Sequence, residues 1–192
     1  MIFAISGSQG VGKSTLINAL HTSHPSITRK TSRSILSDWG VTLSEVNNNR
    51  ELTVRFQDEI LKRKWDDEAE ARADHNRIFC TERTYADLFV YALVAIGKDN
   101  EYSDWIDDYY VKCVNAQACY SDVFYLTGGH FRPEHDGVRA INEHYSRMVD
   151  LVMYEYTKQM TFDGFRVIST PDLSQRIEYL EKYYTKHGEL DV

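Results

Sequence analysis

The sequence predicts an α/β fold in which a mostly parallel sheet of five strands is covered by helices on both faces. The main observation is that segments with the apolar pattern of strands alternate with segments of helical periodicity along the whole chain. No internal repeat and no low-complexity linker interrupts this order. A length of 192 residues suits one compact domain with a full core, so we expect a single domain over residues 1–192.

The first twenty residues predict a strand, a glycine loop and a helix. The apolar run 2–5 precedes the pattern G-x-x-x-x-G-K-S at residues 7–14, and a helical segment follows it. Glycines let the main chain turn tightly and aim several N–H groups at one phosphate. Lys13 supplies a charge for the β- and γ-phosphates of a nucleoside triphosphate, and the Ser14 hydroxyl can ligate Mg²⁺. This segment therefore predicts a phosphate-binding P-loop.

Composition excludes some classes of function. The 22 basic and 29 acidic residues give a net charge of −7, which argues against a broad, sequence-independent grip on nucleic acid but leaves a local basic groove open. The three cysteines have no C-x-x-C spacing, as expected of a reduced protein. Because no run is apolar enough to span a membrane, we expect a cytoplasmic protein without a membrane partner.

A short second strand is expected at residues 24–29, followed by a helical turn over 32–39 that Gly40 ends. Ser44 is then expected to cap a helix. Up to about residue 73, apolar side chains recur at spacings near four, which predicts one or two long amphipathic helices on the sheet or over the site; they are Leu52, Phe56, Ile60 and Trp65. The basic run 62–64 is interpreted as a solvated face.

Residues 77–84 have the pattern of a buried strand that ends in charge. Because ligands of open α/β sheets bind outside the carboxyl ends of the strands, we expect Glu82 to face the same crevice as Lys13. A carboxylate there can hold Mg²⁺ or accept a proton from an attacking hydroxyl, and Arg83 can neutralise phosphate charge. Asp87, at the start of a helix over 85–96, has two interpretations: a first-turn charge that suits the helix dipole, or a substrate contact.

The rest of the chain predicts helices at 104–117, 140–160 and 173–184, with strands at 121–127 and 165–169. The polar loop 128–139 contains two adjacent glycines and two arginines. Glycines allow a hinge, and arginines can reach phosphate oxygens when such a loop closes. We therefore predict a lid at about 128–139, with Arg132 and Arg139 as its cations.

Taken together, the ordered motifs resemble the NadR-like small P-loop kinases, a group related to nicotinamide-riboside kinase domains and more distantly to deoxynucleoside and thymidylate kinases. The resemblance covers nearly the whole chain. It rests on the P-loop, Arg33, the F-Q-x-x-I-L segment at 56–61, E-R-T at 82–84 with Asp87 and Tyr91, D-G-V-R at 136–139, and Thr170-Pro171 with Arg176.

The resemblance implies a nucleoside- or nucleotide-kinase-like P-loop NTPase that uses ATP and Mg²⁺. It assigns ATP binding to Gly7, Gly10, Val11, Gly12, Lys13, Ser14, Thr15 and Arg176. Mg²⁺ would be held by Ser14 and Glu82. The catalytic group comprises Lys13, Glu82, Arg83, Arg132 and Arg139, and the acceptor would contact Arg33, Gln57, Asp87 and Tyr91.

One departure from the family concerns the general base. These kinases commonly carry an acidic residue at the end of the second strand, whereas residues 28–33 here contain no carboxylate. Either Glu82 or Asp87 takes that role, or positioning and charge neutralisation suffice, as a loose transition state permits. Arg29, Lys30 and Arg33 either favour an acceptor that already carries phosphate or form a solvated basic patch.

We favour a kinase that transfers the γ-phosphoryl group of ATP to a hydroxyl or phosphate of a small nucleoside- or nucleotide-like acceptor. A second hypothesis places the acceptor in phage DNA, as a hydroxymethylated pyrimidine flipped out of the duplex, although the net acidity counts against it. A third is a nucleotide-switched regulatory or motor ATPase, although an AAA-type motor would normally need more chain for a lid domain than these residues provide. A homodimer is compatible with each of these.

Overall fold

The computed structural model describes residues 1–20, 26–27, 31–129 and 142–188, and within them it contains a five-stranded sheet. The strands lie in the order β2-β3-β1-β4-β5, and every neighbouring pair is parallel. Their bounds are β1 Ile2–Ser6, β2 Ser26–Ile27, β3 Phe79–Glu82, β4 Asp122–Leu126 and β5 Phe165–Ile168. The predicted α/β sheet is therefore confirmed.

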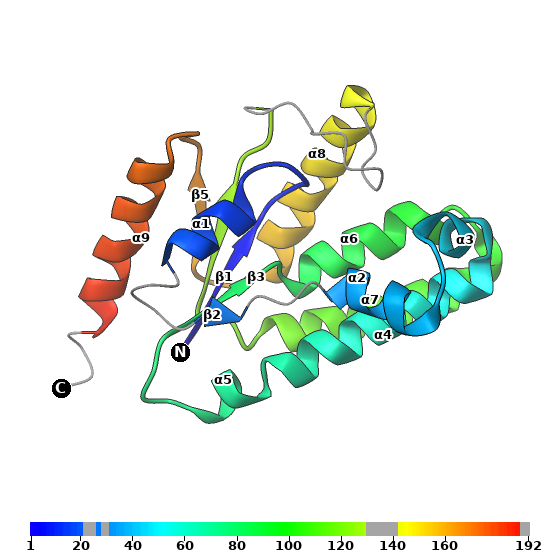
Figure 1. Cartoon of the computed structure of the whole chain (residues 1–192), viewed down its shortest axis with the longest axis horizontal. Coiled ribbons are helices and arrows are strands. Elements are labelled where there is room, and N and C mark those ends of the chain that lie inside the picture. Colours follow the sequence, from blue (N-terminus) through cyan, green and yellow to red (C-terminus); the bar gives the residue numbers. More distant parts are fainter. Residues whose placement is uncertain (21–25, 28–30, 130–141, 189–192) are drawn as a thin grey trace.

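Helices cover both faces of this sheet. Their bounds are α1 Lys13–Leu20, α2 Thr31–Trp39, α3 Leu43–Asn48, α4 Arg50–Asp67, α5 Ala69–Ala73, α6 Tyr85–Ile96, the 3₁₀ turn η1 Asn100–Tyr102, α7 Ser103–Gln117, α8 Glu143–Met160 and α9 Leu173–Gly188. Figure 1 shows α1 and α9 on one face, with α4, α6, α7 and α8 gathered on the other.

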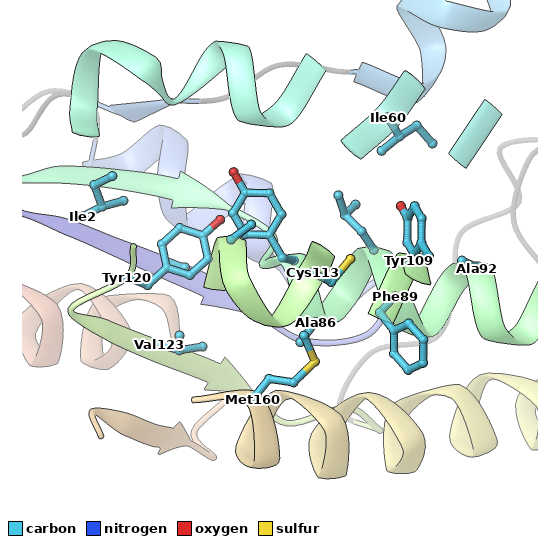
Figure 2. Packing of buried hydrophobic residues seen from close by; sticks show 14 of the residues in the cluster. Ile2, Ile60, Ala86, Phe89, Ala92, Tyr109, Cys113, Tyr120, Val123 and Met160 are labelled. Carbon is cyan, nitrogen blue, oxygen red and sulfur yellow. The ribbon is translucent and has the colours of Figure 1, made fainter. Parts of the chain in front are cut away.

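Alternate residues of β1 enter two different cores, because successive side chains of a strand face opposite sides. Phe3 and Ile5 pack with α1 and α9. Ile2 and Ala4 belong to a larger core on the opposite face. Figure 2 shows side chains from four helices meeting there: Ile60, Ala86, Phe89, Cys113 and Met160. With both faces buried, the carboxyl edge of the sheet is where loops can present polar groups.

The region predicted as one or two amphipathic helices forms three, and its first cap is not Ser44. The Thr42 hydroxyl accepts from the Glu45 N–H at 3.2 Å, and the Glu45 carboxylate accepts from the Thr42 N–H at 2.7 Å. This capping box needs a carboxylate or amide side chain of the Glu/Gln type three positions after the cap, which Thr42 has and Ser44 lacks. Asn49 then has an extended backbone and caps α4.

The apolar stripe of α4 continues through Lys64 rather than Trp65. Trp65 is 44% exposed, whereas Lys64 is only 7% exposed. A step of four from Phe56 leads through Ile60 to position 64, which therefore faces the interior. The prediction that residues 62–64 form a solvated face was wrong for Lys64, because its ammonium group is paired with the buried Glu68.

Most of the predicted lid lies outside the described residues. Of residues 128–139, the structure describes only Gly128 and Gly129. The predictions for Arg132 and Arg139 fall on residues outside the description, as do Arg29 and Lys30 of the basic cluster. In the part of the chain that the structure describes, no helix combines the length and the apolar character that crossing a membrane requires.

Candidate active site

The glycine loop between β1 and α1 is held against the neighbouring strand β4. Gly7, Gly10 and Gly12 all have positive φ, at 137°, 84° and 90°. A Cβ atom at Gly7 would lie 2.6 Å from the carbonyl oxygen of Leu126, so only glycine fits there. Val11 is buried, while Ser14 and Thr15 are exposed in the first turn of α1. The loop thus has the path and the helix N-terminus that phosphate binding needs.

Lys13 lies folded against this loop and is 5% exposed. Its Nζ donates to the carbonyl oxygens of Gly7 at 2.6 Å and Ser8 at 2.7 Å. Burial, together with the nearby charge of Arg83, lowers the pKa of Lys13 to about 8. Phosphate oxygens at the loop would offer this ammonium group a stronger partner than neutral carbonyls do.

The first polar contact across the site joins Ser14 to Glu82. The Ser14 hydroxyl donates to Glu82 Oε1 at 2.9 Å. The contact follows from the sheet register, since β1 and β3 are neighbours and Ile5 lies opposite Glu82. Mg²⁺ prefers oxygen ligands and is commonly bound through one or two side chains plus substrate phosphates. A hydroxyl and a carboxylate side by side at a P-loop fit that requirement.

Arg83, the next residue, has a left-handed backbone with φ 69°, which is uncommon for a residue other than glycine. Its N–H donates to the carbonyl oxygen of Ile5 at 2.9 Å. Its guanidinium carbon lies 5.0 Å from the centre of the Tyr91 ring, in a cation–π arrangement. This turn orients Arg83 toward α6 and brings together two of the residues that the sequence assigned to the site.

Asp87 is fully buried in the first turn of α6. Its Oδ1 accepts hydrogen bonds from two hydroxyls. One donor is Ser6, at the end of β1, and the other is Thr84, whose Oγ1 lies 2.8 Å from Oδ1. Its Oδ2 has no hydrogen-bond partner within the described residues. Burial raises the pKa of Asp87, although the charge of Lys13, the Ser6 hydroxyl and Arg83 oppose the rise. Asp87 is therefore both a first-turn carboxylate and a neighbour of the P-loop lysine.

Arg176 of α9 is 2% exposed, and its side chain contacts the main chain of the P-loop. Its Nη1 donates to the carbonyl oxygen of Val11 at 2.6 Å, and its Nε donates to that of Thr170 at 2.6 Å. A Cβ atom at Gly12 would lie 3.1 Å from the same guanidinium group. The structure thus places Arg176 where it positions the loop through the main chain.

The other two residues predicted to contact the acceptor lie on α4 and α2. Gln57 is 8% exposed on α4, and Tyr109 donates to its main-chain oxygen at 3.2 Å. Arg33 is exposed in the first turn of α2. The helices that carry them stand on the same side of the sheet as α6, which carries Asp87 and Tyr91 (Figure 1).

One buried cluster beside the site was missed from the sequence. Lys64 Nζ donates to Glu68 Oε1 at 2.7 Å and reaches the main-chain oxygen of Glu82 at 3.3 Å. The sequence did contain an indication of this cluster, because residues 56, 60, 64 and 68 follow one another at a spacing of four and so share one helix face. A Lys and a Glu on an apolar stripe at that spacing indicate a buried pair.

A glycine loop with its lysine, hydroxyl and carboxylate on a parallel sheet defines a P-loop nucleotide-binding protein. A family model described as "AAA domain" matches residues 2–176, and the chain belongs to this family. No curated protein matches the chain by sequence.

Solved structures with the same fold include deoxyadenosine kinase and NadR. Deoxyadenosine kinase from M. mycoides with bound dATP superposes with a TM-score of 0.73 at 17% identity, over 96% of this chain and 100% of that chain. The NadR protein in complex with NR gives 0.67 at 13% identity, over 95% of this chain and 51% of that chain. The NadR protein with NAD and AMP-PNP gives 0.64 at 11% identity, over 100% of this chain and 50% of that chain. The chain therefore has the fold of small P-loop nucleoside kinases and spans about half the length of the NadR chains.

Proposed function

We propose that this protein is an ATP- and Mg²⁺-dependent kinase that transfers the γ-phosphoryl group to a hydroxyl or phosphate of a nucleoside- or nucleotide-like acceptor. The observation that carries the proposal is the contact between Ser14 and Glu82 at a P-loop whose Lys13 lies beside them. The likeness in fold to deoxyadenosine kinase with dATP and to NadR with AMP-PNP supports it.

On the ATP side, the loop N–H groups and Lys13 hold the β- and γ-phosphates, with Gly7, Gly10, Gly12 and Thr15 shaping the cradle. Ser14 and Glu82 would hold Mg²⁺, which neutralises charge on the phosphates when it is bound. Arg83 supplies a further cation at the transferred group, and Arg132 and Arg139 are proposed to add theirs from the lid. Phosphoryl transfer depends mainly on such positioning and charge neutralisation.

On the acceptor side, we propose that Asp87 rather than Glu82 is the general base. The Glu82 carboxylate already pairs with Ser14 in the proposed metal site. Asp87 keeps one oxygen without a hydrogen-bond partner in the described part of the chain, and burial raises its pKa, which makes it a stronger base. Tyr91, Gln57 and Arg33 complete the proposed acceptor pocket.

We also propose a cytoplasmic location. Its support is that Cys80, Cys113 and Cys119 are all free thiols, as is usual in a reducing compartment.

A transfer assay with labelled ATP and Mg²⁺ tests the function. The acceptor panel contains nicotinamide riboside, nucleosides, deoxynucleoside monophosphates, and duplex DNA with and without hydroxymethylated pyrimidines. Label on a small molecule supports the proposal and identifies the acceptor. Label confined to modified DNA would instead support DNA modification, and ATP hydrolysis without transfer to anything would support a regulatory ATPase. Lys13→Ala is the control, because it removes the phosphate-binding cation from the loop.

A further inference from the structure

We propose that the buried Lys64–Glu68 pair is a positioning device for the turn from Glu82 to Thr84, and that it sets how strongly the site binds Mg²⁺ on a nucleotide. The inference rests on the proposed function in one respect, which is that Glu82 is taken as a metal ligand. Neither Lys64 nor Glu68 is placed at the reacting groups.

The ammonium group of Lys64 donates three hydrogen bonds, one to Glu68 and two to residues of β3. Its Nζ donates to Glu68 Oε1 at 2.7 Å, to Thr81 Oγ1 at 3.2 Å and to the main-chain oxygen of Glu82 at 3.3 Å. The described part of β2 ends at Ile27, opposite Thr81. Lys64 therefore supplies a side-chain donor for the main chain just beyond that pairing, at the residue that carries the proposed metal ligand.

Glu68 fixes Lys64 from the other side and is fully buried between α4 and α5. Its Oε1 also accepts from Thr81 Oγ1 at 2.7 Å. Its Oε2 accepts from the hydroxyls of Tyr85 at 2.8 Å and Tyr120 at 3.2 Å. Because both carboxylate oxygens have donors, this network holds one arrangement rather than several.

The two tyrosines also enclose the ammonium group. Their rings stack with centres 5.5 Å apart, and Lys64 Nζ lies 5.4 Å from the Tyr85 ring and 5.8 Å from the Tyr120 ring. Tyr85 is the first residue of α6, directly after the turn. The network therefore contacts the turn at Thr81, at the Glu82 carbonyl and at Tyr85, on both sides of the strained Arg83.

The position of this pair indicates a role beyond stability. A buried ion pair is often no more stabilising than apolar side chains of the same volume, so stability alone does not account for it. Arg83 holds a left-handed backbone that persists only where its surroundings fix it. Without Lys64, the Glu82 peptide would lose a donor, and the Glu82 carboxylate would lose its fixed orientation toward Ser14.

The test measures nucleotide affinity rather than turnover. The Kd of AMP-PNP is determined by calorimetry in EDTA and in excess Mg²⁺, for the wild type and for Lys64→Met combined with Glu68→Gln, which removes both charges together. We expect the Kd in EDTA to stay near the wild-type value. We expect the gain in affinity from Mg²⁺ to fall about tenfold, as for the loss of partners that orient metal ligands. Lys62→Met, an exposed neighbour on α4, is the control and should leave both values unchanged.

An unchanged Mg²⁺ gain in the folded double variant overturns the inference and leaves the proposed function intact. A wild type that gains nothing from Mg²⁺ overturns the metal role of Glu82, and the inference with it. If the double variant does not fold, the same Mg²⁺ gain is measured in Lys64→Arg. This variant keeps the charge beside Glu68 but replaces a compact ammonium with a planar group. A reduced Mg²⁺ gain in Lys64→Arg supports positioning, and a wild-type gain overturns it.

Discussion

The Ser14 hydroxyl and the Glu82 carboxylate are joined by a 2.9 Å hydrogen bond across 68 positions of sequence. Two features bring them together: Ser14 lies in the first turn of α1, directly after the glycine loop, and Glu82 ends the strand that pairs with β1. Both therefore stand at the carboxyl edge of the sheet, where the phosphates of a nucleotide on the loop would lie.

Replacing Glu82 by Gln should separate metal binding from nucleotide binding. The amide keeps the size of the side chain but removes the charge that Mg²⁺ requires, so we expect turnover to fall about 100-fold. Affinity for ATP in EDTA should stay unchanged, because the loop and Lys13 are untouched. Steady-state kinetics and calorimetry measure the two quantities, with Glu70→Gln, an exposed carboxylate, as the control. Wild-type turnover in Glu82→Gln would remove Glu82 from the mechanism.

The lowered pKa of Lys13 should make ATP binding depend on pH. In the free protein, burial and Arg83 lower this pKa to about 8 from its ordinary 10.5. Bound phosphate favours the charged form and raises the pKa again, so binding takes up a proton in the window above pH 8. Affinity should therefore fall as pH rises through this window.

Calorimetry in buffers of different ionisation enthalpy measures that proton uptake directly. Lys13→Ala should abolish it and weaken ATP binding at every pH. Proton uptake that persists in the variant would assign the effect to another group.

Asp87→Asn should distinguish the general base from the metal ligand. The amide oxygen can still accept from Ser6 and Thr84, so the variant should fold and should keep its Mg²⁺-dependent ATP affinity. Loss of a general base costs about 100-fold or more in rate, and the acid limb of the pH–rate profile should disappear with it. That limb rises with pH in the wild type, because the base must be ionised. An unchanged rate would mean that charge neutralisation alone suffices.

The P-loop and the edge of β3 could be predicted because their information is local. Glycine spacing fixes the loop, and an apolar run ending in charge fixes the strand; the sheet rule then places Glu82 beside Lys13. In the structure, Glu82 lies at the P-loop and accepts a hydrogen bond from Ser14, the residue after Lys13. The sequence also contained the pattern that identifies Thr42 as a helix cap, since Glu45 stands three residues later.

The environments of Lys64 and Arg176 could not be predicted so directly, because distant elements create them. Lys64 is buried only because Tyr85 and Tyr120 enclose it and Glu68 pairs with it. Arg176 was assigned to ATP through family resemblance, whereas in the structure its guanidinium group donates to the carbonyl oxygens of Val11 and Thr170. The proposed acceptor pocket is harder still to predict, since its proposed residues lie on α2, α4 and α6 and no local pattern sets the spacing of these helices.

Two glycine substitutions should differ sharply although both alter the same loop. In Gly7→Ala the new Cβ would lie 2.6 Å from a backbone oxygen that cannot yield, so we expect loss of ATP binding and a stability cost above about 3 kcal/mol. At Gly10 a Cβ would meet nothing within 4 Å, and only the positive φ is strained, at a cost of about 1 kcal/mol. Thermal unfolding and ATP titration compare the two, and equal effects would contradict the close approach to β4.

Arg176→Lys should show that the loop depends on support from α9. A lysine at this position keeps the charge but cannot donate from two fixed directions to the carbonyls of Val11 and Thr170. Losing one buried hydrogen bond to a charged group costs about 2 kcal/mol, and a looser loop should bind ATP about tenfold more weakly. Chemical denaturation and calorimetry measure both effects. Lys182→Ala, an exposed residue of the same helix, should change neither. If Arg176→Lys lost ATP affinity without losing stability, Arg176 would have to contact the nucleotide itself rather than support the loop.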